Sequence, residues 1–180
     1  MTTRICLLRG VNVTGKNPMN MKELALCLSR TGMDNVSTYI QSGNVLYHSD
    51  KSIAADTETI HKEILAQWGY DLPVLVFDAT QLGKWIEESP FAGKPEVNPE
   101  KLHVTYLHAT PAAALLTDLL PTVLPGEAFA FGDRVVYLYC PGGYGNTKLD
   151  NTFFEKKLKV AATTRNWKTT LKLLELSRDY

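Results

Sequence analysis

The loop from Gly10 to Asn17 carries the residue types that bind phosphate groups. Its glycines free the backbone N–H groups to converge on an anion, Lys16 adds positive charge, and a helix is predicted to begin shortly afterwards. The loop matches the first seven positions of a P-loop, but Asn17 occupies the eighth, where a Ser or Thr hydroxyl would reach Mg²⁺. This spacing argues against a nucleoside triphosphatase and leaves two interpretations, an anion-binding loop or a simple turn.

A second polar segment, Gln41 to Asn44, is predicted to form the turn of a β-hairpin. Ser42, Gly43 and Asn44 all favour turns, whereas Gln41 has no such reason to be there. If the first and third strands are central neighbours in a split βαβ sheet, Asn44 lies near the loop that follows Leu8. The segment is thus either a plain turn or part of the same site.

The C-terminal half contains a comparable glycine loop, Gly142 to Lys148. Thr147 is predicted to cap the helix that follows, which places Lys148 in the first turn, where acidic residues are normally preferred. An anion bound between Lys148 and the loop would explain that placement. Further along, capping of the last helix explains Asn166, while Arg165 beside it has no structural explanation.

Formal charge cancels over the chain, with 19 basic and 19 acidic residues, but its distribution is uneven. Residues 1–30 carry five basic side chains against Glu23 alone, and residues 146–180 carry eight against four acidic ones. Both basic ends coincide with a glycine loop next to a predicted helix start. The asymmetry predicts an anionic partner that contacts both ends of the chain, although solvated helix faces would also account for most C-terminal lysines.

Several other kinds of site are disfavoured. His103 and His108 lie on opposite faces of one predicted strand, with no Cys or carboxylate at ligand spacing, so neither a metal nor another cofactor is expected. No G-x-S-x-G or other nucleophile signature occurs. Cys6 and Cys140 lie in apolar strand patterns and Cys27 lies in a predicted helix, and all three are expected to be reduced, buried thiols.

Tyrosines on the hairpin strands raise an alternative, since stacking aromatics bind RNA on the faces of some sheets. These residues are Tyr39, Tyr47, Tyr137 and Tyr139. The RNP1 pattern is absent from both hairpins, so the side chains are interpreted as core residues.

The elements that must position all these residues occur in the same order twice: strand, helix, strand, tight turn, strand, helix, strand. This order predicts an α+β fold built as a tandem duplication of a ferredoxin-like βαββαβ unit, each half an antiparallel sheet with helices on one face. Residues 1–78 are the first half, residues 79–100 a connecting helix and linker, and residues 101–180 the second half with an extra C-terminal helix. Each half is small, so the two are expected to pack together.

Local signals support these assignments. Asn20 is predicted to cap the first helix, Ser42-Gly43 and Gly132-Asp133 to close the hairpins, and Thr110-Pro111 to start a helix that continues to Leu119 and Leu120. No apolar run approaches the ~20 residues that cross a bilayer, and the first apolar stretch is too short for a signal peptide. No membrane association is expected, and the protein is predicted to be cytoplasmic.

Two motifs, Leu7 to Asn17 and Thr38 to Val45, resemble the bacterial family known as domain of unknown function 1697. Segments 145–148 and 163–169 are similar to two further signatures of that family, so the resemblance covers nearly the whole chain. Thr147 replaces a usual serine, and Thr14 replaces a glycine found in many members, which makes the first loop stiffer here. The resemblance implies a pair of ferredoxin-like halves and no assigned activity.

The leading hypothesis is that the protein binds an anionic ligand, such as a nucleotide, a nucleic acid or a phosphorylated small molecule, in a basic cleft between the two halves. The residues expected to bind it are Arg9, Asn12, Lys16, Gln41, Asn44, Lys148, Arg165 and Asn166. One alternative is an enzyme acting on a phosphate-containing substrate, a phosphatase or transferase, by analogy with acylphosphatases, which hold phosphate after the first strand with an arginine and an asparagine. Another alternative is a protein-interaction module whose polar motifs only cap helices and form turns.

Overall fold

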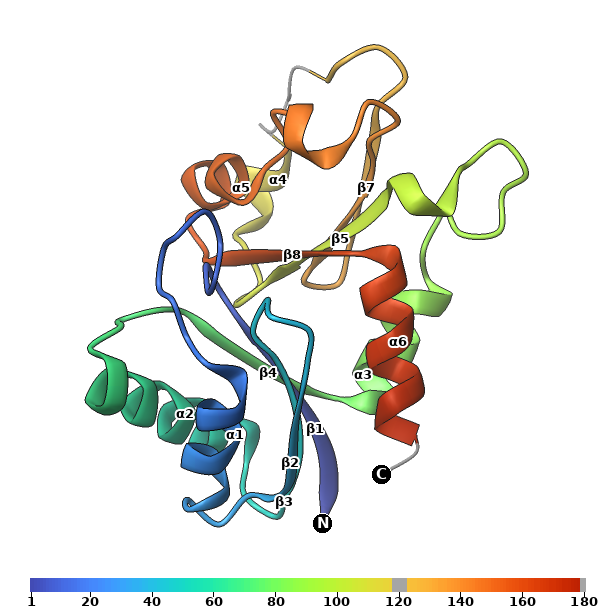
Figure 1. Ribbon diagram of the computed structural model, residues 1–180. Helices are drawn as coiled ribbons and strands as arrows, with labels where there is room; N and C mark the ends of the chain where they lie inside the picture. The colour runs from blue at the N-terminus through green and yellow to red at the C-terminus, as the bar shows by residue number, and fades with distance from the viewer. Residues whose placement is uncertain (118–122, 179–180) are drawn as a thin grey trace. The chain divides into compact units, whose positions relative to one another are not determined.

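The computed structural model describes residues 1–117 and 123–178. In this part of the chain, six α-helices and eight strands form a mixed α and β fold with two four-stranded antiparallel sheets (Figure 1). The chain divides into two compact units: Met1–Leu82 together with the C-terminal residues from Leu173 on, and Gly83–Lys172. Among the described helices, none is both long and apolar enough to cross a membrane.

The sheet of the first unit consists of β1 (Thr2–Leu8), β2 (Asp34–Tyr39), β3 (Asn44–Ser49) and β4 (Val74–Asp78), in the order β2-β3-β1-β4. All neighbouring strands are antiparallel. The helices α1 (Met21–Ser29) and α2 (Ile53–Trp68) lie on the same side of this sheet (Figure 1). The first and third strands are therefore central neighbours, as the repeated element order predicts.

The core between these helices and the sheet follows from two periodicities. Alternate strand residues point toward the helices, while helix residues three or four apart share one face. The buried cluster includes Cys6, Leu8, Val45, Tyr47 and Val76 from the strands, and Leu24, Leu28, Ile60 and Ile64 from the helices. Tyr47 and Tyr137 are both buried, which confirms them as core residues rather than stacking platforms, whereas Tyr39 and Tyr139 are half-buried.

The second unit repeats this order. Its strands are β5 (Leu102–Leu107), β6 (Ala128–Gly132), β7 (Val135–Tyr139) and β8 (Ala162–Asn166), arranged as β6-β7-β5-β8. Its helices between strands are α4 (Ala113–Thr117) and α5 (Asn151–Leu158). The order matches that of the first sheet, strand for strand.

The remaining helices are α3 (Ala79–Glu87), α6 (Trp167–Arg178) and two short 3-10 helices, η1 (Pro99–Lys101) and η2 (Tyr144–Asn146). Both α3 and α6 contain a boundary between the two units. The helix expected from Thr110-Pro111 begins at Ala113. Its expected continuation to Leu119 and Leu120 lies outside the described residues.

Candidate functional site

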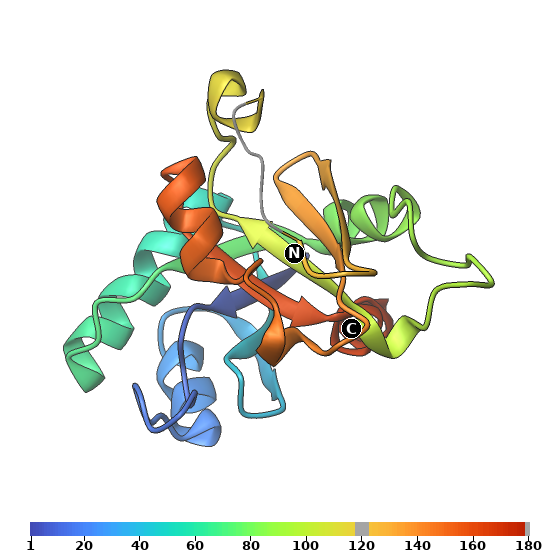
Figure 2. The ribbon, with the colours of Figure 1, turned by 90° about the horizontal axis from the view of Figure 1, so that it is seen from above.

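The loop after β1 closes on itself as a short finger. The N–H of Asn12 donates to the carbonyl of Asn17 at 3.3 Å, and the N–H of Lys16 donates to the carbonyl of Val13 at 2.9 Å. The side chain of Lys16 is exposed on this turn. Figure 2 shows the loop leaving the end of β1 and returning to α1. Because the amides of Asn12 and Lys16 are occupied by carbonyls, the loop is not the open phosphate cradle of a P-loop.

Asn12 holds this loop in place with its whole side-chain amide. Its Nδ2 donates to the carbonyls of Met19 and Gln41, both at 2.9 Å, and its Oδ1 accepts from the N–H of Met19 at 2.8 Å. Asn17 adds a bond from its Nδ2 to the carbonyl of Gly10 at 3.0 Å. Thus Asn12 ties together the start of α1, the finger and the hairpin turn.

The hairpin turn between β2 and β3 packs against the end of β1. The N–H of Leu8 donates to the carbonyl of Gly43 at 2.8 Å, and Asn44 is the register partner of Leu7. This confirms the predicted proximity of Asn44 to the loop after Leu8. Asn44 itself is fully buried, and its Nδ2 donates to the Tyr39 carbonyl and to the Ser42 hydroxyl, each at 3.0 Å.

Strained backbone concentrates in these two segments. Five of the eight residues from Gly10 to Asn17 have a left-handed φ, and so does Ile40 in the hairpin turn. Asn and Gly tolerate this conformation, but β-branched residues such as Thr14 and Ile40 rarely adopt it. Clustered strain of this kind is typical of functional sites, where the surrounding structure enforces it.

The side chains that face solvent here differ from those that hold the backbone. Lys16 and Gln41 are exposed and Arg9 is half-buried. Asn12 and Asn44 are committed to the loop and the turn. The first unit therefore brings together all five of its predicted residues, three as accessible groups and two as supports.

In the second unit, the predicted helix start after the glycine loop is wrong. Helix α5 begins at Asn151, and Asp150 is its N-cap, accepting from the N–H of Phe153 at 2.7 Å. Thr147 instead accepts from the N–H of Leu149 at 3.1 Å in a local turn. Lys148 is exposed and lies before the N-cap, outside the first turn of α5. Its position therefore needs no bound anion to explain it. A carboxylate at the cap satisfies the helix N-terminus better than a threonine next to a lysine would.

Arg165 has a structural explanation that its sequence context does not reveal. It is 8% exposed, and its Nη1 donates to the hydroxyl of Thr163 and the carbonyl of Thr164, both at 2.9 Å. The neighbouring Asn166 accepts from the N–H of Thr169 at 2.7 Å, which confirms its predicted capping of α6. These two side chains stabilise the junction between β8 and α6.

The sequence gives no local signal for a network of hydroxyl groups on β5 and β8. The hydroxyl of Thr164 bonds with that of Thr105 at 2.8 Å, accepts from Tyr144 Oη at 3.0 Å and donates to Asn151 Oδ1 at 2.7 Å. Tyr144 also stacks on His103, with ring centroids 4.8 Å apart. Each of these residues is ordinary alone, and only the strand register that pairs Thr105 with Thr164 brings them together.

The half-buried ring of His103 indicates a pH dependence of stability. Desolvation lowers the pKa of His103 from its ordinary value of 6.5. The unfolded chain therefore takes up this proton more readily than the folded one. Stability is complete above about pH 6.5 and falls as the pH drops through the pKa of the folded state. Thermal unfolding should show a lower midpoint at about pH 5 than at about pH 7.5.

The variant His103→Phe serves as the control for this prediction. It keeps an aromatic ring to stack on Tyr144 and has no proton to gain, so its unfolding midpoint should vary less with pH. If the wild type and this variant lose stability equally on acidification, His103 is not the responsible group.

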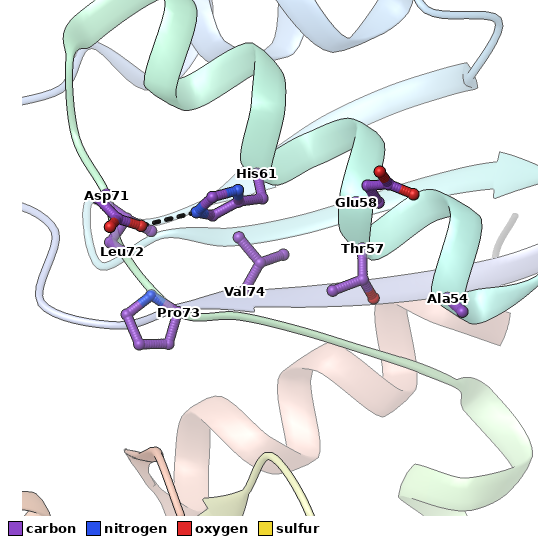
Figure 3. A pocket seen from close by; sticks show the side chains of 8 residues that line it. All are labelled: Ala54, Thr57, Glu58, His61, Asp71, Leu72, Pro73 and Val74. Carbon is purple, nitrogen blue, oxygen red and sulfur yellow. Dashed lines mark hydrogen bonds and ion pairs between the residues drawn. The ribbon is translucent and has the colours of Figure 1, made fainter.

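A cavity of about 660 Å³ runs along α2 in the first unit (Figure 3). Within it, His61 Nε2 and Asp71 Oδ1 lie 2.8 Å apart. Its lining residues are Ala54, Thr57, Glu58 and His61 from α2, and Asp71, Leu72, Pro73 and Val74 from the segment leading into β4. Two carboxylates and an apolar floor disfavour phosphate, so this cavity is separate from any anion site. The His61–Asp71 pair has no sequence signal, because it depends on where the chain turns after α2.

Metal and thiol chemistry find no support in the described part of the chain. No group of three or more His, Cys, Asp or Glu residues there could hold a metal ion. Cys6 and Cys140 form no disulfide and are buried as predicted, whereas Cys27 is only half-buried. Burial, with a contribution from Glu127, raises the pKa of Cys140 to about 11. Burial and a hydrogen bond to Glu63 also raise the pKa of Cys27, so neither thiol is an activated nucleophile.

A solved structure, that of the conserved bacterial protein SP0830 from Streptococcus pneumoniae, is similar to this chain. Its TM-score is 0.71 at 22% sequence identity, and 98% of each chain is covered. At this identity the likeness shows the fold alone. The search of curated proteins found no match.

The family described as "Protein of unknown function (DUF1697)" matches residues 1–137. The matched residues include both N-terminal motifs, Leu7 to Asn17 and Thr38 to Val45, while segment 163–169 lies beyond the match. Since more than half of the sequence is matched, the resemblance is confirmed: the chain belongs to the DUF1697 family of proteins of unknown function.

Proposed function

We propose that the first unit binds a phosphorylated or otherwise anionic ligand at the finger and the adjoining hairpin turn, residues 9–18 and 40–44. The observation that carries this proposal is the use of Asn12. The hydrogen bonds of its side-chain amide hold a strained, exposed loop that presents Lys16. A loop ordered before binding loses less conformational entropy when a ligand arrives, which favours affinity.

The roles within this site follow from exposure. Lys16 and Arg9 supply positive charge, and the exposed Gln41 side chain orients the ligand by hydrogen bonding. Asn12 and Asn44 position the loop and the turn. In the second unit, Lys148 is an exposed cation, and Arg165 and Asn166 support the junction between β8 and α6.

The binding hypothesis is preferred over the acylphosphatase analogy because of Asn44. In that analogy an asparagine must reach the substrate beside the arginine. Asn44 is fully buried and its amide donates inward to the Tyr39 carbonyl and the Ser42 hydroxyl. This residue therefore has no access to a substrate or to an attacking water.

Two broader inferences accompany the proposal. The two units share one element order and one strand order, which supports a tandem duplication of a ferredoxin-like unit. None of the three cysteines forms a disulfide, which is consistent with a reducing compartment and supports a cytoplasmic protein.

Pyrophosphate binding by the full chain, measured by calorimetry at low salt, tests the proposed function. Lys16→Ala removes a charge-assisted contact and should weaken binding by about tenfold. Lys62→Ala is the matched control, because Lys62 is an exposed lysine of the same unit on α2. Binding should also weaken as salt rises. An unchanged affinity in Lys16→Ala would exclude the finger as the anion site.

A further inference from the structure

Ile40 is placed where its residue type is least expected. Its φ is +51°, and its side chain is 49% exposed. A β-branched side chain in the left-handed region meets a steric penalty that Gly or Asn would avoid. Burial in the core could offset such a penalty elsewhere, but half of this side chain faces solvent. An isoleucine here lowers the stability of the free protein. A contact that its side chain makes in a bound state would offset that cost.

A second exposed aliphatic side chain lies on the adjoining finger. Val13 is 51% exposed. The hydrogen bond from Asn12 Nδ2 to the Gln41 carbonyl, 2.9 Å long, joins the residue next to Val13 to the residue next to Ile40. Both aliphatic groups therefore flank one locked junction between the two segments, and the exposed Lys16 lies on the same finger.

We infer that Ile40 and Val13 form the apolar half of the anion site and contact the nucleoside part of a nucleotide whose phosphates pair with Lys16. This inference rests on the proposed function and narrows it to one ligand class. Every nucleobase has a flat π-face, so packing of this face on apolar side chains does not depend on which base is present. An anion without an apolar part would gain nothing from a strained, exposed isoleucine.

A lipid surface is the other source of phosphate beside apolar groups, and the structure favours it less. Even a single myristoyl chain gives only marginal membrane binding. Two aliphatic side chains and the cations Lys16 and Arg9 offer less apolar area than such a chain.

Comparison of ADP with pyrophosphate tests this inference, because the two share a diphosphate and differ by adenosine. Calorimetry on the full-length wild type should show ADP binding about tenfold more tightly. In Ile40→Gly the ratio of the two affinities should fall to about one, because adenosine loses its apolar contact. Ile40→Leu keeps an apolar side chain and should retain most of the ratio. Leu65→Ala removes a comparably exposed aliphatic group from α2 and should leave it unaltered.

Stability supplies an independent readout. Ile40→Gly relieves the left-handed strain, so its thermal midpoint should rise by about 2–4 °C while ADP binding weakens. A ratio that Ile40→Gly leaves unchanged overturns the inference, even if pyrophosphate binding still depends on Lys16. Equal binding of ADP and pyrophosphate by the wild type overturns it as well. So does binding of the wild type to phosphatidylserine vesicles without ADP, if Ile40→Gly abolishes that binding. Pyrophosphate binding that ignores Lys16 counts instead against the proposed function.

Discussion

Replacing Gly43 by Ala is expected to destabilise the first unit by about 3 to 5 kcal/mol. A Cβ atom at this position would lie 2.8 Å from Leu8 Cβ and 3.4 Å from Val11 Cβ. Leu8 Cβ is fixed by the backbone of a central strand, and the Leu8 side chain is fully buried, so it has no room to yield. Gly43 also has a φ of +73°, which adds backbone strain to the clash.

Gly15→Ala separates these two causes. Gly15 has a φ of +78°, but an added Cβ would meet nothing within 4 Å. Its substitution should therefore cost only the backbone strain, about 1 kcal/mol. Hydrogen exchange of the β1 and β3 amides measures the free energy of unfolding of this unit in both variants. Equal losses at the two positions would show that contact with Leu8 is unimportant.

Removing the side-chain amide of Asn12 should have the second-largest effect, because it acts on stability and on binding together. Asn12→Ala deletes three hydrogen bonds, two to Met19 and one to Gln41. The expected loss of stability is about 2 kcal/mol, since these bonds are only partly shielded from water. Pyrophosphate affinity should fall by about tenfold, because the finger that presents Lys16 is no longer ordered before binding.

A glycine at the same position shows which property of Asn12 matters. Asn12 has a φ of +53°, which Ala adopts poorly and Gly adopts freely. Asn12→Gly should therefore recover part of the stability lost in Asn12→Ala but little of the pyrophosphate affinity. Full recovery of binding by the glycine variant would mean that backbone conformation alone orders the finger. Calorimetry and hydrogen exchange on the same three proteins decide between these outcomes.

The order of elements was predictable because its signals are local. Turn residues such as Ser42-Gly43, the capping residues Asn20 and Asn166, and the apolar periodicities act within a few positions of the chain. The boundary of α5 was the exception among these signals. Thr147 and Asp150 are both competent caps, and the choice of Asp150 depends on how the preceding glycine loop and η2 are packed.

The sequence by itself determined which residue types meet at the ends of β1 and β3, because strand order follows from the repeated pattern of elements. Only the tertiary structure decided the role of each side chain. Asn44 turned inward, Arg165 became a buried support, and Ile40 stayed exposed in a strained conformation. The direction of a side chain in a turn depends on φ values that distant contacts impose, such as the bond from Asn12 to the Gln41 carbonyl and the packing of Gly43 on Leu8. Local sequence patterns do not predict those contacts.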